Sequence, residues 1–300
     1  MTELVQGTQK DVDHETSEYL ESFKPRAMDW TAAKTFAIKN LRIAIRYPAN
    51  LLVWGILPIF WFAPFILMAT AIAGPETSTN FTNISGFDNY IQFVVIGWFV
   101  YMYLDNSIWA IGNNFRWEQM SGTLEPLFST PVPRISILLG AAISDTVQGT
   151  LQAGILLGIC MVLFGLEYSL VAILPTIIIL TLMVIALYGF SFMLAGLILV
   201  FKDPSVLSEM ISEMTFMVSP VNYPVQSLPR SVQFAAYLVP TTIGIVTIRE
   251  IAINGVVDLL TFSQSVLSLG ILAVCFWVVG ISVFKYAEKW TKTRGHMGGF

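Results

Sequence analysis

Long apolar stretches separated by short polar segments dominate the chain. Five of them carry at most one charged residue each: 51–73, 91–111, 138–164, 170–200 and 259–284. A helix of about 20 residues crosses the roughly 30 Å of hydrocarbon in a bilayer. These stretches therefore predict five membrane-spanning helices.

A sixth apolar stretch, residues 205–220, is shorter and less regular. Glu209 and Glu213 hold its first turns near water, and Pro220 ends it. Residues 221–255 are interrupted by further prolines, so they predict a broken, re-entrant stretch on the extracellular side before the last span. The whole pattern predicts an all-α integral membrane fold with six transmembrane helices.

Residues 30–46 have the periodicity of an amphipathic helix directly before the first span. At 100° per residue its apolar residues share one broad face, while Lys39, Arg42 and Arg46 cluster on another. Such a helix lies in the inner interface of the membrane, with its cations against anionic lipid headgroups. A solvated helix without a partner is the alternative interpretation.

The composition agrees with a membrane protein. Of the 300 residues, 55% are hydrophobic and 12% charged, against about 25% charged in a typical soluble protein. Too few charges remain to cover a water-soluble globule. The two cysteines lie in apolar runs and the two histidines near the ends, so neither a disulfide framework nor a metal site is indicated. Without a basic array, nucleic-acid binding is not expected.

The cations predict the orientation. With an inner N-terminus and six crossings, every Lys and Arg except Arg230 and Arg249 falls on the inner side. Because cytoplasmic loops carry the excess of Lys and Arg, we expect a protein of the cell membrane with both termini in the cytoplasm. The acidic residues 1–29 do not resemble a signal peptide. We expect them to form a disordered tail, and residues 291–300 to form a short C-terminal one.

The inner loop 112–137 mixes charges with large apolar residues and is too short for a core of its own. Exposed apolar surface rimmed by charge indicates a docking site for another protein. From Arg116 to Arg134, the loop has a Gly-Thr-Leu-Glu-Pro-Leu core and a Thr-Pro-Val-Pro-Arg ending. This run resembles the signature of permease subunits of type-2 ATP-binding-cassette (ABC) exporters.

The stretch before the last span is similar to the re-entrant hairpin of the same family. It contains Ser-Pro-Val-Asn-Tyr-Pro-Val, Ser-Leu-Pro-Arg, Leu-Val-Pro and Ile-Arg-Glu, with the hairpin candidates Pro220, Pro224, Pro229, Arg249 and Glu250. The resemblance covers residues 30–290, and it is specific in these two stretches. The acidic tail is longer than is usual at the start of the family.

The resemblance implies that the inner loop supplies a coupling helix, which sits in a groove of a separate ATPase subunit. The residues expected to dock there are Arg116, Trp117, Glu118, Gly122, Thr123, Leu124, Glu125, Leu127 and Phe128. The two glutamates would form charge pairs with the ATPase, with ordinary solvation as the alternative. Two permease chains, identical or different, would pair with two ATPase subunits that bind ATP and Mg²⁺.

The chain cannot itself be the ATPase. No lysine in it is preceded by glycine, so the Gly-Lys-Ser/Thr element that cradles phosphates is missing. We therefore expect no cofactor in this chain and no catalysis by it alone.

Polar side chains on two helix faces are candidates for a translocation path. Carboxylates inside a membrane are costly, roughly 2.5–3.5 kcal/mol at a helix centre, and two faces carry one each. The candidates are Trp98, Tyr101, Asp105 and Trp109 on one face, and Asp145, Gln148 and Gln152 on the other. These carboxylates would attract a cationic or amphipathic substrate, hold helices together, or lie in water near the interface.

The sequence therefore predicts the permease subunit of an ATP-driven exporter that works by alternating access. A drug, a lipid or a glycan would fit as substrate. The alternative is a secondary transporter in which Asp105 and Asp145 carry protons. An embedded enzyme is disfavoured because neither histidine lies within a span.

Overall fold

Regular structure in the described part of the chain is helical. The computed structural model describes residues 28–73, 79–123, 126, 130, 132–201, 204–255 and 257–293. Its α-helices are α2 (Trp30–Arg46), α3 (Pro48–Ala73), α4 (Thr79–Ser85), α5 (Tyr90–Met120), α7 (Arg134–Phe164), α8 (Ile173–Phe201), α9 (Pro204–Val218), α10 (Arg230–Tyr237), α11 (Pro240–Asn254) and α12 (Leu259–Thr293). Two 3₁₀ turns, Leu170–Ala172 and Val225–Ser227, complete the set.

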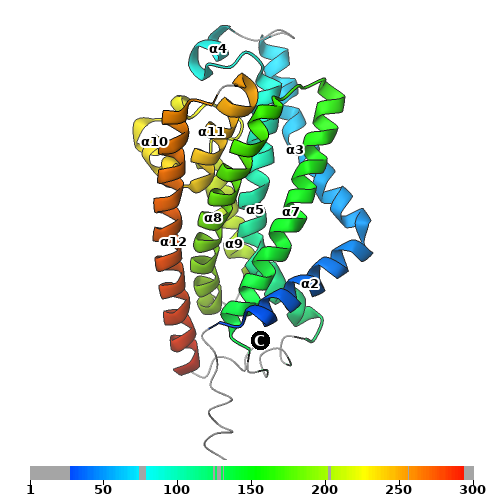
Figure 1. Ribbon diagram of the computed structural model, residues 1–300, viewed down its shortest axis with the longest axis vertical. Coiled ribbons are helices and arrows are strands. Elements are labelled where there is room, and N and C mark those ends of the chain that lie inside the picture. Colours follow the sequence, from blue (N-terminus) through cyan, green and yellow to red (C-terminus); the bar gives the residue numbers. More distant parts are fainter. Residues whose placement is uncertain are drawn as a thin grey trace, which may run out of the picture.

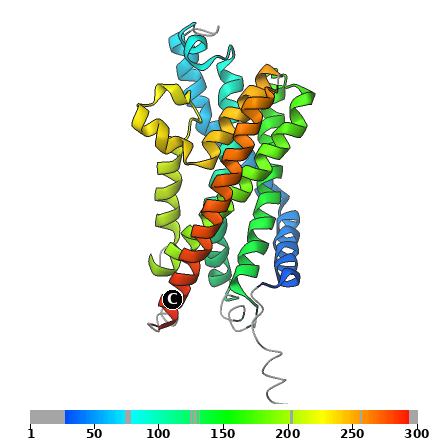
Figure 2. The same cartoon turned by 60° about the vertical axis from the view of Figure 1, so that its left-hand side comes forward.

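Among the described residues, five helices are long and apolar enough to cross a membrane: α3, α5, α7, α8 and α12. The predicted all-α membrane fold is confirmed. Helix α9, at the place of the predicted sixth span, has 15 residues and so a length of about 22 Å. Helices α10 and α11 then meet at an angle of 92°, which gives the stretch before α12 the shape of a hairpin (Figures 1 and 2).

Helix α5 occupies the centre of the bundle and packs against α3, α7, α8, α9 and α11 (Figure 1). Several of its apolar side chains, including Val94, Val100, Leu104 and Ile108, are completely buried. The helix continues well beyond the predicted span end at residue 111, because nothing in the following sequence breaks it. It ends beside Gly122, which has the positive φ of 67° that favours glycine.

Helices α8 and α12 run side by side (Figures 1 and 2). Their backbones come close at Gly189 and Gly280, where an added Cβ on Gly280 would lie 2.3 Å from the carbonyl oxygen of Gly189. Only small residues permit such an approach, which is the usual means of packing helices in a membrane.

Helix α2 lies across one end of the bundle and packs on α7, as Figure 1 shows. Its buried side chains are Ala33, Phe36 and Ala37, on the apolar face that the sequence predicts. Asp29 begins the helix by accepting hydrogen bonds from the amides of Thr31 and Ala32, at 2.9 and 3.2 Å.

Helix α3 forms an outer wall of the bundle. Many of its apolar side chains are exposed, among them Phe60 and Leu67, as expected where a helix faces lipid. Pro58 and Pro64 lie inside it. Each proline lacks the amide that would otherwise bond to the carbonyl four residues earlier.

Candidate functional site

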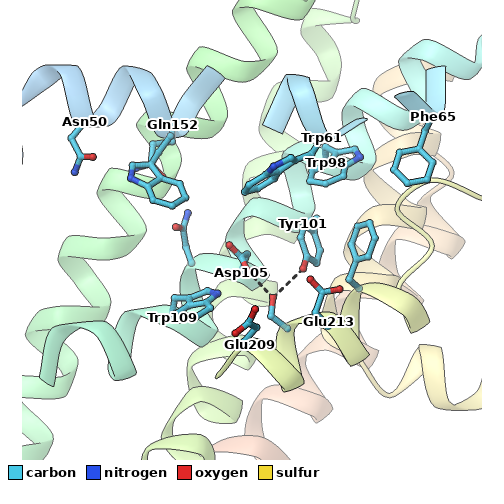
Figure 3. Close-up of a pocket in the computed structure, with 14 residues that line it drawn as sticks. Asn50, Trp61, Phe65, Trp98, Tyr101, Asp105, Trp109, Gln152, Glu209 and Glu213 are labelled. Atoms are coloured by element: carbon cyan, nitrogen blue, oxygen red, sulfur yellow. Dashed lines mark hydrogen bonds between the residues drawn. The ribbon is translucent and has the colours of Figure 1, made fainter. Parts of the chain in front are cut away.

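A cavity of about 690 Å³ opens between α3, α5 and α9 (Figure 3). Helix α5 contributes Trp98, Tyr101, Asp105, Asn106 and Trp109, and α7 contributes Gln152. This volume is within the range of about 300–1,000 Å³ that is typical of small-molecule sites.

The structure brings together most of the predicted path residues. All four candidates on α5 line the cavity because their spacing of three or four residues places them on one face. Gln152 joins them from α7, whereas Gln148 donates a hydrogen bond of 3.4 Å to the carbonyl oxygen of Ser144 on its own helix. Asp145 lies near Tyr188 of α8 instead.

Helix α9 supplies a face that the sequence did not assign to the path. Glu209, Ser212, Glu213 and Phe216 line the cavity, at the spacing of three and four residues that marks one helical face. Periodicity could have grouped these residues. It could not have shown that their face meets α5.

Three side chains form a hydrogen-bonded chain between α5 and α9. The Ser212 hydroxyl donates to Oδ1 of Asp105 at 2.7 Å, and the hydroxyl oxygens of Ser212 and Tyr101 lie 3.1 Å apart. Figure 3 shows both contacts. A polar side chain in a membrane interior requires partners of this kind, so the chain holds Asp105 at the cavity wall.

Four aromatic rings, from α3, α5 and α9, pack together in the cavity wall. The Trp98 ring centroid lies 6.2 Å from that of Trp61, 5.7 Å from that of Tyr101 and 5.5 Å from that of Phe216. These distances lie within the 4.5–7 Å range of favourable aromatic pairs. The indole of Trp98 also donates a hydrogen bond of 2.8 Å to Oδ1 of Asn222, which fixes its orientation.

At the end of the bundle where α2 lies, the last turn of α5 is tied to α2. The ammonium of Lys39 pairs with Oε1 of Glu118, a side chain that is only 5% exposed. The Thr123 hydroxyl donates to the second carboxylate oxygen of Glu118 at 2.6 Å. Lys39 therefore has a protein partner, in contrast to the headgroup contact that its position predicts.

The other predicted docking residues are only partly placed. Arg42 and Arg46 are exposed, so their contact with lipid stays a prediction. The backbone of Arg116 and Trp117 belongs to α5, but their side chains lie outside the described part of the structure. Residues 124, 125, 127 and 128, with the predicted Leu124, Glu125, Leu127 and Phe128, also lie outside it.

The re-entrant hairpin is held to α5 by a buried arginine. Arg249 of α11 is 2% exposed and donates to three carbonyl oxygens, those of Phe93 at 2.9 Å, Pro220 at 2.6 Å and Val221 at 2.5 Å. Its guanidinium lies 3.4 Å from the centroid of the Phe93 ring, within cation–π range. Gly97 leaves space for this group, because an added Cβ there would lie 2.3 Å from Nη2 of Arg249.

The remaining hairpin candidates have separate positions. Pro224 precedes the 3₁₀ turn Val225–Ser227, and Pro229 precedes α10, where its fixed φ suits a helix start. Glu250 lines a second hollow of about 320 Å³ together with Asp258. No group of three metal-binding side chains occurs within the described residues.

Comparison with known families decides the identity. The model of a family described as ABC-2 type transporter matches residues 32–253, from α2 to α11. The chain belongs to the ABC-2 type transporter family. No curated protein matches it. As an ABC-2 type transporter domain, the chain is the membrane component of an ABC transporter, not itself catalytic, and the family implies partnership with an ABC ATPase subunit.

Proposed function

We propose that this chain is the permease subunit of an ATP-driven exporter, which moves a drug, lipid or glycan-type substrate out of the cytoplasm by alternating access. The observation that carries the proposal is the continuity of α5, which runs unbroken from Tyr90 to Met120. One helix thus carries both the cavity residue Asp105 and the terminal residue Glu118. They are 13 residues apart, about 20 Å along the helix axis.

In this proposal, ATPase subunits dock at residues 116–128 and bind ATP and Mg²⁺ themselves. Closure of the ATPases would push on the end of α5, and α2 would follow because Lys39 is paired with Glu118. Tilting of α5 would then change the packing around the cavity on the same helix. A second permease chain, identical or different, would complete the transporter.

The proposed orientation places α2 and the end of α12 in the cytoplasm. Both lie at the same end of the molecule, and α4 and α10 lie at the other (Figure 1). The exposed cations Arg42 and Arg46 are at the α2 end, as expected for the cytoplasmic side of the cell membrane.

Reconstitution tests this function. The tagged chain would be purified from its native membrane with its partners, and the complex would be placed in liposomes. We expect a co-purified subunit with ATPase activity and transport that requires ATP and Mg²⁺. Transport that follows a proton gradient without ATP, or a pure permease that transports alone, would overturn the proposal in favour of a secondary transporter.

A further inference from the structure

The cavity between α3, α5 and α9 has an unusual combination of wall chemistry. Half of its 14 lining residues are aromatic, and three carry carboxylates: Asp105, Glu209 and Glu213. Neither Lys nor Arg occurs among the described residues that line it. Within the described residues, the wall therefore presents negative charge and aromatic faces without a cation.

The carboxylates lie in one part of the cavity. Glu213 is close enough to interact electrostatically with both Asp105 and Tyr101, and Glu209 lies one helical turn from Glu213 on the same face of α9. Glu209 and Glu213 are exposed and Asp105 is partly exposed. All three are thus accessible to a molecule in the cavity, as Figure 3 shows.

The rings of Trp98 and Phe216 continue the cavity away from Asp105 and Glu209. Along α5, Trp98 lies seven residues before Asp105, and along α9, Phe216 lies seven residues after Glu209. Because α5 and α9 run in opposite directions, both offsets point the same way, about 10 Å along the bundle. The cavity thus reaches from the carboxylates, with the Trp109 ring beside Asp105, to the rings of Trp98 and Phe216, at a distance that one small molecule spans.

These features fit one class of ligand. Grouped carboxylates repel one another, and a positive charge between them offsets that repulsion. Aromatic faces carry negative electrostatic potential and bind cations and flat apolar groups. We propose that this cavity binds lipophilic organic cations, with the charged group among Asp105, Glu209 and Glu213 and the apolar body against Trp61, Trp98 and Phe216. As a statement about the exported substrate, this inference rests on the proposed function.

Matched probes of different charge test the cavity. The full chain in lipid nanodiscs would be titrated with tetraphenylphosphonium, with the isosteric anion tetraphenylborate and with neutral triphenylphosphine oxide, with empty nanodiscs as the correction for partitioning into lipid. Binding would be followed by equilibrium dialysis and by tryptophan fluorescence, since four tryptophans line the cavity. We expect the cation to bind at least tenfold more tightly than the anion and the neutral compound.

Charge-neutral variants locate the binding. Asp105→Asn and the double variant Glu209→Gln with Glu213→Gln should each weaken binding of the cation at least fivefold and leave the neutral probe unaffected. Glu167→Gln, an exposed carboxylate outside the cavity, is the control and should bind as the unaltered chain does. If Asp105→Asn does not fold, the double variant carries the test, because both of its sites are exposed.

Two outcomes would overturn the inference: equal binding of the three probes, or unchanged cation binding in the double variant. Neither outcome depends on an ATPase. A complex that transports with ATP but shows no preference for the cation would refute the substrate class and leave the exporter intact. A chain that binds the cation but transports without ATP would refute the exporter alone.

Discussion

Lys39 of α2 and Glu118 of α5 form an ion pair across 79 residues of sequence. Glu118 is buried, whereas the Lys39 side chain is 42% exposed. The ammonium of Lys39 also lies 4.6 Å from the centroid of the Phe36 ring. The pair joins the helix that lies across the bundle to the helix that lines the cavity.

We expect that loss of this ion pair impairs ATP-driven transport more than it lowers the stability of the fold. Lys39→Met and Glu118→Gln should each lower ATP-driven transport several-fold, because α2 no longer follows α5. The free energy of unfolding should fall by only about 1 kcal/mol, as for a partly exposed pair. Transport in liposomes and thermal unfolding measure the two effects.

The charge-exchanged variant Lys39→Glu with Glu118→Lys is the control for that prediction. It should recover part of the transport that Lys39→Glu or Glu118→Lys alone loses, since the double variant restores an ion pair with the two charges exchanged. Additive losses in the double variant would show that the two residues act independently.

Replacement of Arg249 should destabilise the re-entrant hairpin. Arg249→Met leaves three carbonyl oxygens in a buried region without their donor, and we expect a loss of about 3 kcal/mol in stability. Arg249→Lys should recover only part of it, because an ammonium cannot reproduce the planar fork of donors. Thermal unfolding in detergent checks both, and equal stability of Arg249→Met and the unaltered chain would contradict the assigned role.

Two glycines of α7 provide a matched pair that tests how α2 packs. An added Cβ at Gly140 would lie 2.4 Å from the carbonyl oxygen of Ala33, whereas at Gly158 it would meet nothing within 4 Å. Gly140→Ala should lower stability by about 2 kcal/mol through overpacking, and it should weaken transport because α2 is displaced. Gly158→Ala should be neutral or raise stability by up to about 1 kcal/mol, since alanine favours a helix.

Asp258, directly before α12, should make the stability of the folded chain depend on pH. Its carboxylate accepts hydrogen bonds from the Thr261 hydroxyl at 2.6 Å, the Thr261 amide at 3.2 Å and the Leu260 amide at 3.4 Å. These contacts lower its pKa below the ordinary value of 3.8. The pKa of Asp258 is lower in the folded chain than in the unfolded one. The stabilisation is therefore complete at a pH above the ordinary pKa, and it is lost as the pH falls through the pKa of the folded chain.

The measurement compares unfolding midpoints at several pH values. Asp258→Ala should melt below the unaltered chain at neutral pH, and the difference should shrink as the pH falls below the ordinary value. Asp88→Ala, at an exposed aspartate outside the helices, should leave the midpoint unchanged throughout. A constant difference for Asp258→Ala would show that its hydrogen bonds do not depend on ionisation.

The sequence was sufficient for features that depend on local pattern. Apolar stretches with at most one charge each located the five long helices, and the spacing of Trp98, Tyr101, Asp105 and Trp109 placed them on one face that the structure turns into a cavity wall. The amphipathic pattern of residues 30–46 identified the face of α2 that is buried.

Features that depend on which elements meet could not be predicted. Nothing local to Lys39 or Glu118 indicates that they are partners. The partners of Arg249 are backbone carbonyl oxygens. Since every residue has such an oxygen, the sequence does not indicate which residues supply them. The face of α9 was missed for the same reason, since hydropathy does not tell which helix lies opposite.

The two prolines of α3 give the cavity one compliant wall. Pro58 and Pro64 leave the carbonyls of Trp54 and Phe60 without their helical hydrogen bonds, so flexing α3 at these points breaks no bond that lipid would have to replace. Helices α8 and α12, interlocked at Gly189 and Gly280, have no such freedom. A bulky molecule that enters or leaves the cavity sideways past α3 would therefore meet a helix that bends more easily at these two points than one with an unbroken hydrogen-bond ladder.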